Sequence, residues 1–350
     1  MLIVDDSALM RRQLSALFEA EGDFAIRLAR NGQEAVEENI AFQPNVVTLD
    51  INMPVMDGLT ALASMMAERP VPVVMLSSLT EKGALATFEA LNLGAVDFVA
   101  KPGGTISLSL DNVSEMLVAK VRAAVRARIG KPIVRTRLAG KPAKSALPKD
   151  SANVRQAPSD EGIVVIGVST GGPRTLEHIL PQLPEDFPWP IVVVQHMPAS
   201  FTLPFANRMN ELCALKVVEA SRPMALEPGT AYIGKGGADV QVVKRAGKAT
   251  ILPKPESAEY LWHPSVEMLA RSVLDHYEPK NILAVMLTGM GYDGADAFAD
   301  IKKRGGRTIA ESRESAVIFG MPAELISRGG ATVTLHCEKI AKQISVWVCN

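Results

Sequence analysis

The sequence predicts an α/β protein of two domains, each built on a parallel sheet. Short β-branched runs alternate with amphipathic stretches in both halves of the chain, which is typical of parallel strands connected by helices. At 350 residues the chain is long enough for two domains. A basic stretch interrupted by prolines separates the halves. We therefore expect domains at 1–123 and 162–350, joined by a flexible basic linker at 124–161.

The first half is expected to form a doubly wound domain with a five-stranded parallel sheet. The expected strands are 2–4, 25–29, 46–49, 71–76 and 96–100. After the first strand, apolar residues recur at helical spacing. Ser7 is a suitable helix N-cap in front of them, and Gly22 follows the last of them as a helix stop.

Charged and hydroxyl side chains follow the strands of this first half. The residues are Asp5 and Asp6 after strand one, Asp50 at the end of strand three, Ser77 at the end of strand four and Lys101 after strand five. Singly, each is a common loop or cap residue. Together they lie at the carboxyl edge of the sheet, where open parallel sheets bind ligands. Gathered carboxylates need a cation such as Mg²⁺, and one of them can then accept a phosphoryl group.

This half resembles the response-regulator receiver family in the segments LIVDDS, VTLDINMPVMDG, the SS after VVML and the KP after DFVA. The resemblance implies a flavodoxin-like fold, a histidine kinase as phosphodonor and Asp50 as phospho-acceptor. The Mg²⁺ ligands that it implies are Asp5, Asp6, Asp50 and the backbone carbonyl of Asn52. Ser77 and Lys101 would read the phosphoryl group.

The second half is organised around one strand and the glycine-rich turn after it. The β-branched run Ile163–Ile166 is followed by the segment GVSTGGP, which ends at Pro173. Proline suits the first turn of a helix. Ser169 is therefore expected at the tip of a strand–turn–helix junction, as in the G-x-S-x-G nucleophile elbow. A glycine-rich turn can also bind phosphate, so the motif alone leaves both functions open.

Two more apolar strands end in residues that suit a hydrolase. The run 191–195 is followed by His196, and the run 282–287 is followed, within LTGMGYDG, by Asp293. If these strands are parallel neighbours of the first, Ser169, His196 and Asp293 converge on one crevice. Histidine would take the serine proton and aspartate would fix the histidine tautomer, which supports acyl transfer followed by hydrolysis.

Other parts of the second half are expected to have a structural role. The histidines at positions 178, 263, 276 and 336, and the acids Asp239 and Asp296, follow no buried strand. The segment 216–262 is rich in glycine and proline, and its pieces 231–233 and 240–243 are expected to form β-hairpins.

The chain order Ser…His…Asp differs from the Ser…Asp/Glu…His order of α/β-hydrolases. The segments IGVSTGGP, VVVQHMP, HPSVEML, LTGMGYDGA and IAESRESAVIFGMP instead resemble the chemotaxis protein-glutamate methylesterase family. The resemblance implies hydrolysis of glutamyl methyl esters on methyl-accepting chemoreceptors to glutamate and methanol, and deamidation of receptor glutamines. It implies no cofactor for the esterase reaction.

The resemblance also assigns residues within the second domain. Ser169 would be the nucleophile, His196 the base and Asp293 its orienting partner. Backbone N–H groups of Thr170 and Met290 are the implied oxyanion-hole donors. The chain departs from the usual family pattern at Val168, where alanine is usual, and at Tyr292, where asparagine is usual; Tyr292 would narrow the crevice.

The composition excludes several other kinds of protein. The net charge of −1 gives no support to nucleic-acid binding. The N-terminal segment has no features of a signal peptide, and Cys213, Cys337 and Cys349 are too far apart to suggest a disulfide framework or zinc site. We expect a cytoplasmic monomer that acts on membrane-embedded receptors. The alternative, a non-enzymatic response regulator with a nucleotide-binding output domain, leaves His196 and Asp293 without a role.

Overall fold

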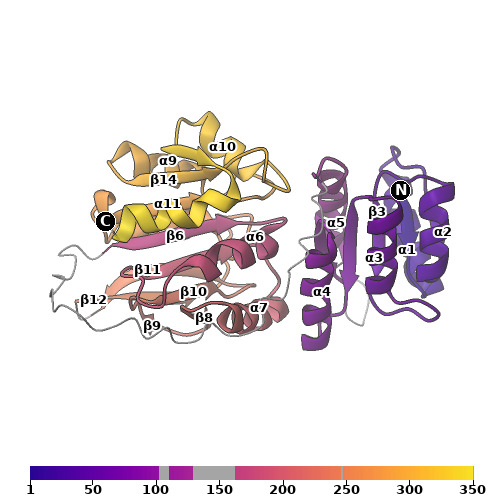
Figure 1. Ribbon diagram of the computed structural model, residues 1–350, viewed down its shortest axis with the longest axis horizontal. Coiled ribbons are helices and arrows are strands. Elements are labelled where there is room, and N and C mark those ends of the chain that lie inside the picture. The colour runs from indigo at the N-terminus through magenta and orange to yellow at the C-terminus, as the bar shows by residue number, and fades with distance from the viewer. Residues whose placement is uncertain (102–109, 129–161, 246, 350) are drawn as a thin grey trace, which may run out of the picture.

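The computed structural model describes residues 1–101, 110–128, 162–245 and 247–349, which form two α/β domains (Figure 1). The last helix of the first domain, α5, ends at Val125, two residues into the expected linker. Residues 126–128 follow the helix, and the remaining part of the expected linker, 129–161, lies outside the described residues.

The N-terminal domain has a five-stranded parallel sheet in the order β2-β1-β3-β4-β5. The strands are β1 (Leu2–Val4), β2 (Arg27–Ala29), β3 (Val47–Asp50), β4 (Val73–Ser77) and β5 (Asp97–Ala100). The helices are α1 (Ala8–Ala20), α2 (Gly32–Ala41), α3 (Gly58–Glu68), α4 (Glu81–Leu93) and α5 (Leu110–Val125). Apolar side chains of α1 and α5 cover one face of the sheet, and those of α2, α3 and α4 cover the other.

Local sequence signals account for the start and end of the first helix. The Ser7 side chain accepts a hydrogen bond from the Met10 N–H, as an N-cap does. Gly22 adopts a φ of 79° after the helix, a left-handed conformation that glycine reaches without strain. The prediction for this helix is confirmed.

The C-terminal domain has a seven-stranded parallel sheet in the order β15-β14-β13-β6-β7-β10-β8. Its strands are β6 (Ile163–Val168), β7 (Ile191–Gln195), β8 (Lys216–Ala220), β10 (Thr230–Gly234), β13 (Ile282–Met286), β14 (Arg307–Glu311) and β15 (Val333–Leu335). Strands β13, β6 and β7 are adjacent and parallel, so the residues that follow them meet at one edge.

Helices cover both faces of this second sheet. The helices are α6 (Gly172–Ile179), α7 (Ala199–Leu212), α8 (Val266–Leu274), α9 (Ala295–Lys303), α10 (Met321–Ser327) and α11 (Cys337–Cys349), with 3₁₀ turns at Leu180–Gln182 and Pro279–Asn281. Apolar residues of α6, α7 and α11 pack on one face, and those of α8, α9 and α10 pack on the other.

The prediction of a β-hairpin is confirmed for the segment 240–243 and wrong for the segment 231–233. Strand β11 (Asp239–Arg245) pairs antiparallel with β12 (Lys248–Lys254), and β9 (Met224–Ala225) completes a small sheet. The segment 231–233 instead belongs to β10, which pairs parallel with both β7 and β8. All five residues of β10 are buried. Its position inside the main sheet depends on contacts with distant strands, which a short apolar run does not reveal.

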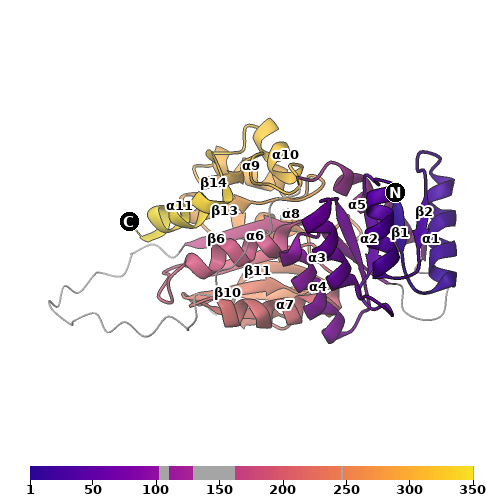
Figure 2. The same ribbon diagram turned by 45° about the vertical axis from the view of Figure 1, so that its right-hand side comes forward.

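The two domains pack against each other through aromatic side chains. Helix α4 lies beside α7 (Figure 2). The Phe88 ring of α4 lies 5.4 Å from that of Phe205, and the Phe98 ring of β5 lies 4.6 Å from that of Phe201. All four side chains are buried, so this contact excludes water from a continuous apolar area.

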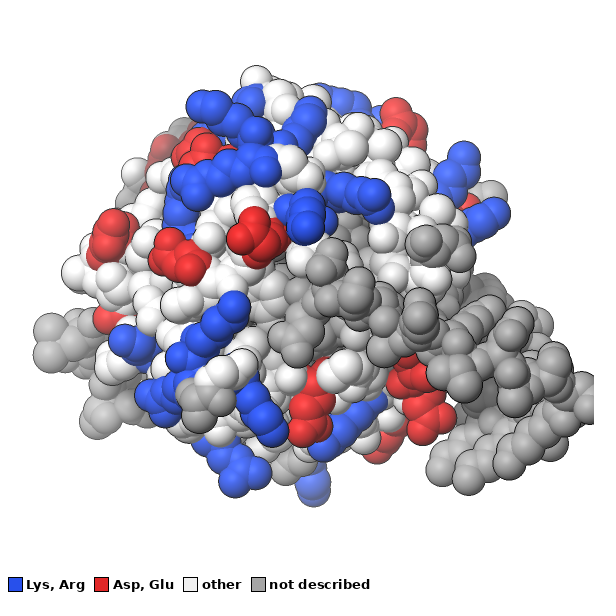
Figure 3. All heavy atoms as spheres, turned by 90° about the vertical axis from the view of Figure 1, so that its left-hand side faces the viewer, with Lys and Arg blue, Asp and Glu red and all other residues white. Residues whose placement is uncertain are grey.

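The end of the C-terminal domain that faces away from the N-terminal domain carries lysine and arginine beside aspartate and glutamate (Figure 3). In the described part of the chain no helix combines the length and apolarity needed to cross a membrane.

Candidate active site and phosphoryl site

The glycine-rich turn after β6 holds Ser169 at the junction of a strand and a helix, as predicted. The Ser169 N–H donates to the carbonyl of Thr288 (3.0 Å), which ties the turn to the end of β13. Gly171 has a φ of 77°, which a side chain would strain, and α6 begins at the next residue. Ser169 is largely buried, at 9% exposure.

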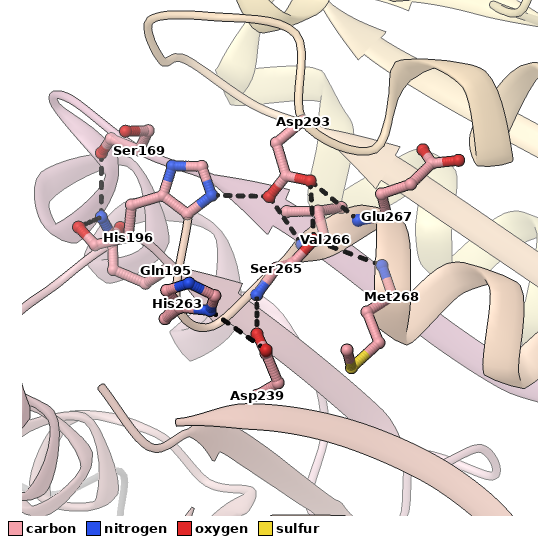
Figure 4. Close-up of polar contacts among 10 residues, drawn as sticks. All are labelled: Ser169, Gln195, His196, Asp239, His263, Ser265, Val266, Glu267, Met268 and Asp293. Carbon is pink, nitrogen blue, oxygen red and sulfur yellow. Dashed lines mark hydrogen bonds and ion pairs between the residues drawn. The ribbon is translucent and has the colours of Figure 1, made fainter. Parts of the chain in front are cut away.

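The His196 ring lies between Ser169 and Asp293 (Figure 4). Its Nε2 is 2.8 Å from the Asp293 carboxylate. A carboxylate accepts only, so Nε2 carries the proton and Nδ1 of the neutral ring keeps a free lone pair. Nδ1 is buried, lies on the Ser169 side of the ring, and has no hydrogen-bond partner among the described residues. This nitrogen is therefore available to take a proton from the serine.

Four hydrogen-bond donors hold the Asp293 carboxylate, and three of them lie at the N-terminus of α8. They are the His196 Nε2–H (2.8 Å), the Ser265 hydroxyl (2.9 Å) and the N–H groups of Val266 (2.7 Å) and Glu267 (3.0 Å). Burial alone would raise the pKa of Asp293, but these hydrogen bonds and the histidine hold that pKa below its usual value. The carboxylate therefore stays ionised and fixed in position.

Two aromatic residues, Trp262 and Tyr292, pack beside the His196 ring. The Trp262 ring stacks on the His196 ring at 5.6 Å with an interplanar angle of 3°. Tyr292 meets Trp262 edge to face at 5.2 Å and is 49% exposed. Together with parts of α8 and α9, these two aromatic residues line a cavity of about 140 Å³ beside Asp293. That Tyr292 narrows the crevice around Ser169 stays a prediction.

A second histidine–aspartate pair supports the site, and the sequence reasoning missed it. Asp239 follows no buried strand, which predicts a structural role, yet it is fully buried at the start of β11. It accepts from His263 Nδ1 (3.0 Å) and from the N–H groups of Ser257 (3.0 Å) and Ser265 (3.0 Å). Asp239 thus positions Ser265, the N-cap of α8, which itself contacts Asp293.

A buried network behind the elbow joins Ser169 to β14. The Thr288 hydroxyl donates to the Thr170 carbonyl (2.9 Å), and the Thr288 N–H donates to Glu311 (2.8 Å). Glu311 also accepts from the Ser315 hydroxyl (2.9 Å). Burial raises the pKa of Glu311 to about 7, because two neutral donors offset only part of the lost hydration.

The N-terminal domain contacts the residue next to the nucleophile. The Thr170 hydroxyl donates to Asp97 at 2.6 Å, and both side chains are buried. Asp97 also forms an ion pair with Lys120 of α5 (3.0 Å). Met290, the other implied oxyanion-hole residue, is half-buried in the loop after β13. The N-terminal domain therefore reaches the edge of the crevice through a charged hydrogen bond.

The predicted acidic cluster is present at the carboxyl edge of the first sheet. Ligand oxygens of Asp5, Asp6 and Asp50 lie within 4.8 Å of one another. Lys101 Nζ pairs with Asp5 (2.7 Å) and Asp50 (2.8 Å). Burial and the Asp5 carboxylate raise the pKa of Asp50 despite the lysine. Carboxylate oxygens this close fit a hard divalent cation such as Mg²⁺. Asn52 is exposed in the adjoining loop.

Ser77 is turned toward α4. Its hydroxyl donates to the Gly83 carbonyl (3.1 Å) and accepts from the Thr87 hydroxyl (2.8 Å). Ser77 therefore links the end of β4 to the first turns of α4, the helix that packs on the C-terminal domain.

Comparison with known proteins decides the family. Residues 1–138 match the response regulator receiver domain, and residues 164–344 match the CheB methylesterase. This chain belongs to the CheB methylesterase family. The CheB methylesterase catalytic domain of Thermotoga maritima superposes with a TM-score of 0.51 and 39% identity, covering 53% of this chain and 97% of that one.

Two relatives match this chain along almost their whole length. The chain is 53% identical to "Protein-glutamate methylesterase/protein-glutamine glutaminase 3" of Rhodospirillum rubrum, covering 99% of this chain and 95% of the relative. It is 50% identical to "Protein-glutamate methylesterase/protein-glutamine glutaminase 2" of Rhodopseudomonas palustris, over 99% and 97% of the two chains.

Proposed function

We propose that this CheB-family chain hydrolyses glutamyl methyl esters on chemoreceptors, under the control of phosphorylation, with Ser169 as nucleophile, His196 as base and Asp293 as its orienting partner. The observation that carries the proposal is the histidine itself: Nε2 is bonded to a fixed carboxylate, and the buried Nδ1 on the Ser169 side has no partner in the part of the chain that the structure describes. The domain boundaries 1–123, 124–161 and 162–350 are part of this proposal.

The ester reaction proceeds in two steps. Ser169 Oγ attacks the ester carbonyl carbon while its proton passes to His196 Nδ1. The tetrahedral oxyanion is stabilised by the N–H groups of Thr170 and Met290. The C–O bond to methanol then breaks as the imidazolium returns the proton to the leaving oxygen. Water then attacks the serine ester while His196 Nδ1 takes its proton. The bond between the acyl carbon and Ser169 Oγ breaks as the imidazolium returns this proton to Oγ, which releases glutamate and restores the serine.

The same steps act on a glutamine side chain, with ammonia as the leaving group. The neutral amide is a less reactive acyl group, so protonation of the leaving nitrogen by His196 matters more. The "protein-glutamine glutaminase" part of the relatives' names supports this second activity. Neither reaction calls on a cofactor in this scheme.

The receiver domain would accept a phosphoryl group from a histidine kinase onto Asp50. Asp5, Asp6, Asp50 and the Asn52 carbonyl would hold Mg²⁺, which would neutralise charge on the phosphoryl oxygens. Lys101 would pair with a phosphoryl oxygen.

Phosphorylation would act through the interface between the domains. We propose that the unphosphorylated receiver restricts access to Ser169 through the Asp97–Thr170 hydrogen bond and the aromatic contact around Phe88. Ser77 would turn from Gly83 toward the phosphate, loosening α4. This is a shift of population between docked and open arrangements. The enzyme would work as a cytoplasmic monomer on receptors held in the membrane.

The test is methanol release from methylated chemoreceptors in membranes. Ser169→Ala should abolish release while circular dichroism stays unchanged, because only the nucleophile is lost. Release at the wild-type rate by this variant would show that Ser169 is not the nucleophile. Absence of release by the wild-type protein, with and without phosphodonor, would refute the proposed activity.

A further inference from the structure

Gln195 contacts the nucleophile and the base at the same time. It is the last residue of β7, and its register partner on β6 is Val168, so it lies directly beside the elbow. It is 2% exposed. Its Nε2 donates to the Ser169 carbonyl (3.0 Å) and to the His196 carbonyl (3.1 Å), and Figure 4 shows the first of these bonds.

The orientation of this amide is determined by its partners. Both partners are carbonyl oxygens, which only accept, so the NH₂ end must face them. The opposite orientation would place Oε1 against two oxygens. Oε1 is buried beside Gly172 and has no hydrogen-bond partner among the described residues. A Cβ at Gly172 would collide with Oε1, so the glycine of the turn makes room for the amide.

The bond to Ser169 also orients the peptide that follows it. In a trans peptide the C=O and N–H point in opposite directions. The Ser169 carbonyl is held by Gln195 from the neighbouring strand and by the Gly172 N–H from within the turn (2.8 Å). The Thr170 N–H therefore points away from both donors. This is the group that the proposed mechanism uses in the oxyanion hole.

We infer that Gln195 is a positioning residue for the hydrolysis, holding the Ser169–Thr170 peptide and the His196 backbone at a fixed separation. The inference rests on the proposed function, because it needs Ser169 and His196 to react with each other. A buried amide with a wholly unpartnered oxygen is costly for folding alone, and such groups call for a specific explanation. The explanation is that the Gln195 amide donates to the backbone of both the nucleophile Ser169 and the base His196.

Gln195→Met is the main test, because methionine has a similar length and no donor. We expect kcat for methanol release to fall about 10- to 100-fold, since a shift of about 1 Å in reacting groups costs that much. KM should stay within twofold, because a buried side chain does not contact the receptor. Phosphonylation of Ser169 by a small fluorophosphonate should slow in parallel with kcat.

Gln182→Met is the matched control. Gln182 also donates from Nε2 to a backbone carbonyl, that of His178 (2.7 Å), but on the exposed surface. This variant should keep wild-type kcat and labelling rate. A folded Gln195→Met protein with kcat within twofold of wild type overturns the inference. An inactive wild-type protein would instead refute the proposed function, so the two failures are distinct.

Two further measurements decide the matter if Gln195→Met does not fold. Gln195→Glu keeps the volume and replaces only the donor end with oxygen, so it should lose at least as much kcat. In the wild-type protein, the Gln195 side-chain amide protons should exchange with solvent far more slowly than those of Gln182. Equal exchange rates for the two amides would show that the double hydrogen bond does not form.

Discussion

Asp50 and Asp293 are buried to nearly the same degree, at 4% and 3% exposure, and each lies at the carboxyl edge of a parallel sheet. Their pKa values nevertheless shift in opposite directions, upward for Asp50 and downward for Asp293. Asp293 faces a histidine and three donors of the α8 N-terminus, whereas Asp50 shares one lysine with the neighbouring Asp5. The neighbouring groups, and not the degree of burial, therefore decide the direction of each pKa shift. They distinguish Asp293, which orients a histidine, from Asp50, which still needs a cation.

Glu311 extends this comparison to a third environment. It is fully buried like the other two, but its two partners, Thr288 and Ser315, are neutral donors. Its pKa rises to about 7. The three carboxyls thus differ by their neighbours: the pKa of Asp293 is lowered, that of Asp50 is raised, and that of Glu311 is raised to about 7.

The largest effect on kcat is expected at Asp293, whose carboxylate accepts hydrogen bonds from four donors. Asp293→Asn should reduce kcat roughly 10³-fold or more, because an amide no longer fixes the histidine tautomer or stabilises the imidazolium. Asp296→Asn is the control: this exposed aspartate lies three residues away on α9 and pairs with Arg328. Steady-state methanol release measures both variants. A loss of less than tenfold in Asp293→Asn would mean that the carboxylate does not orient the base.

Asp50→Asn should abolish labelling by a small phosphodonor and remove its stimulation of hydrolysis, leaving the unphosphorylated rate. Chelation of Mg²⁺ should have the same effect on the wild-type protein, since the carboxylate cluster needs a cation before a phosphoryl group can approach. Asp57→Asn, which alters the N-cap of α3 in the same loop, is the control and should still be labelled. Labelling that persists in Asp50→Asn would place the acceptor elsewhere.

A moderate effect is expected at the domain interface. Asp97→Ala removes the hydrogen bond to Thr170 and should raise unphosphorylated hydrolysis about 10- to 100-fold, since a hydrogen bond to a charged group is worth about 1.5–3 kcal/mol. Asp23→Ala is the matched control, because Asp23 pairs with Arg122, likewise on α5, but on the exposed surface. If both variants hydrolyse receptor at the wild-type rate, the Asp97 contact does not restrain the enzyme.

Much of this site follows from the positions of residues at strand ends. Ser169, His196 and Asp293 each follow an apolar run, and strands of that kind end at one sheet edge. The supporting residues do not follow from such a rule. Ser265 and Trp262 reach the site because α8 and the loop before it pack back onto the sheet, and Asp239 supports Ser265 from β11. Contacts of this type depend on tertiary packing between segments far apart in the chain, which no local pattern reports.

The contacts between the two domains could not be predicted from the sequence either. Asp97 and Thr170 are 73 positions apart and belong to different domains. In the sequence, Asp97 is an unremarkable residue in a strand, and Phe88 and Phe205 are ordinary members of amphipathic helices. Only the docked arrangement of the two sheets brings these side chains together, whereas the acidic cluster of the receiver needs only its own strand order.

The smallest effect on activity is expected at Glu311, where the readout is stability. The native state holds this proton up to a pKa of about 7, whereas the unfolded chain releases it near the ordinary value of 4.5. The stabilisation is therefore complete below about pH 4.5 and is lost progressively as the pH rises to about 7. The full loss is about 3 kcal/mol, because one pKa unit corresponds to about 1.4 kcal/mol.

Glu311→Gln should remove this pH dependence. The glutamine oxygen can accept from the Thr288 N–H, and its NH₂ can donate to the Ser315 hydroxyl, so the variant resembles the protonated acid at every pH. Its catalytic-domain melting temperature should match wild type at pH 4 and exceed it by several degrees at pH 8. Calorimetry of both proteins at the two pH values measures the difference. Equal melting temperatures at pH 8 would mean that Glu311 is compensated as fully as Asp293, and the ranking of the three carboxyls by their neighbours would be wrong.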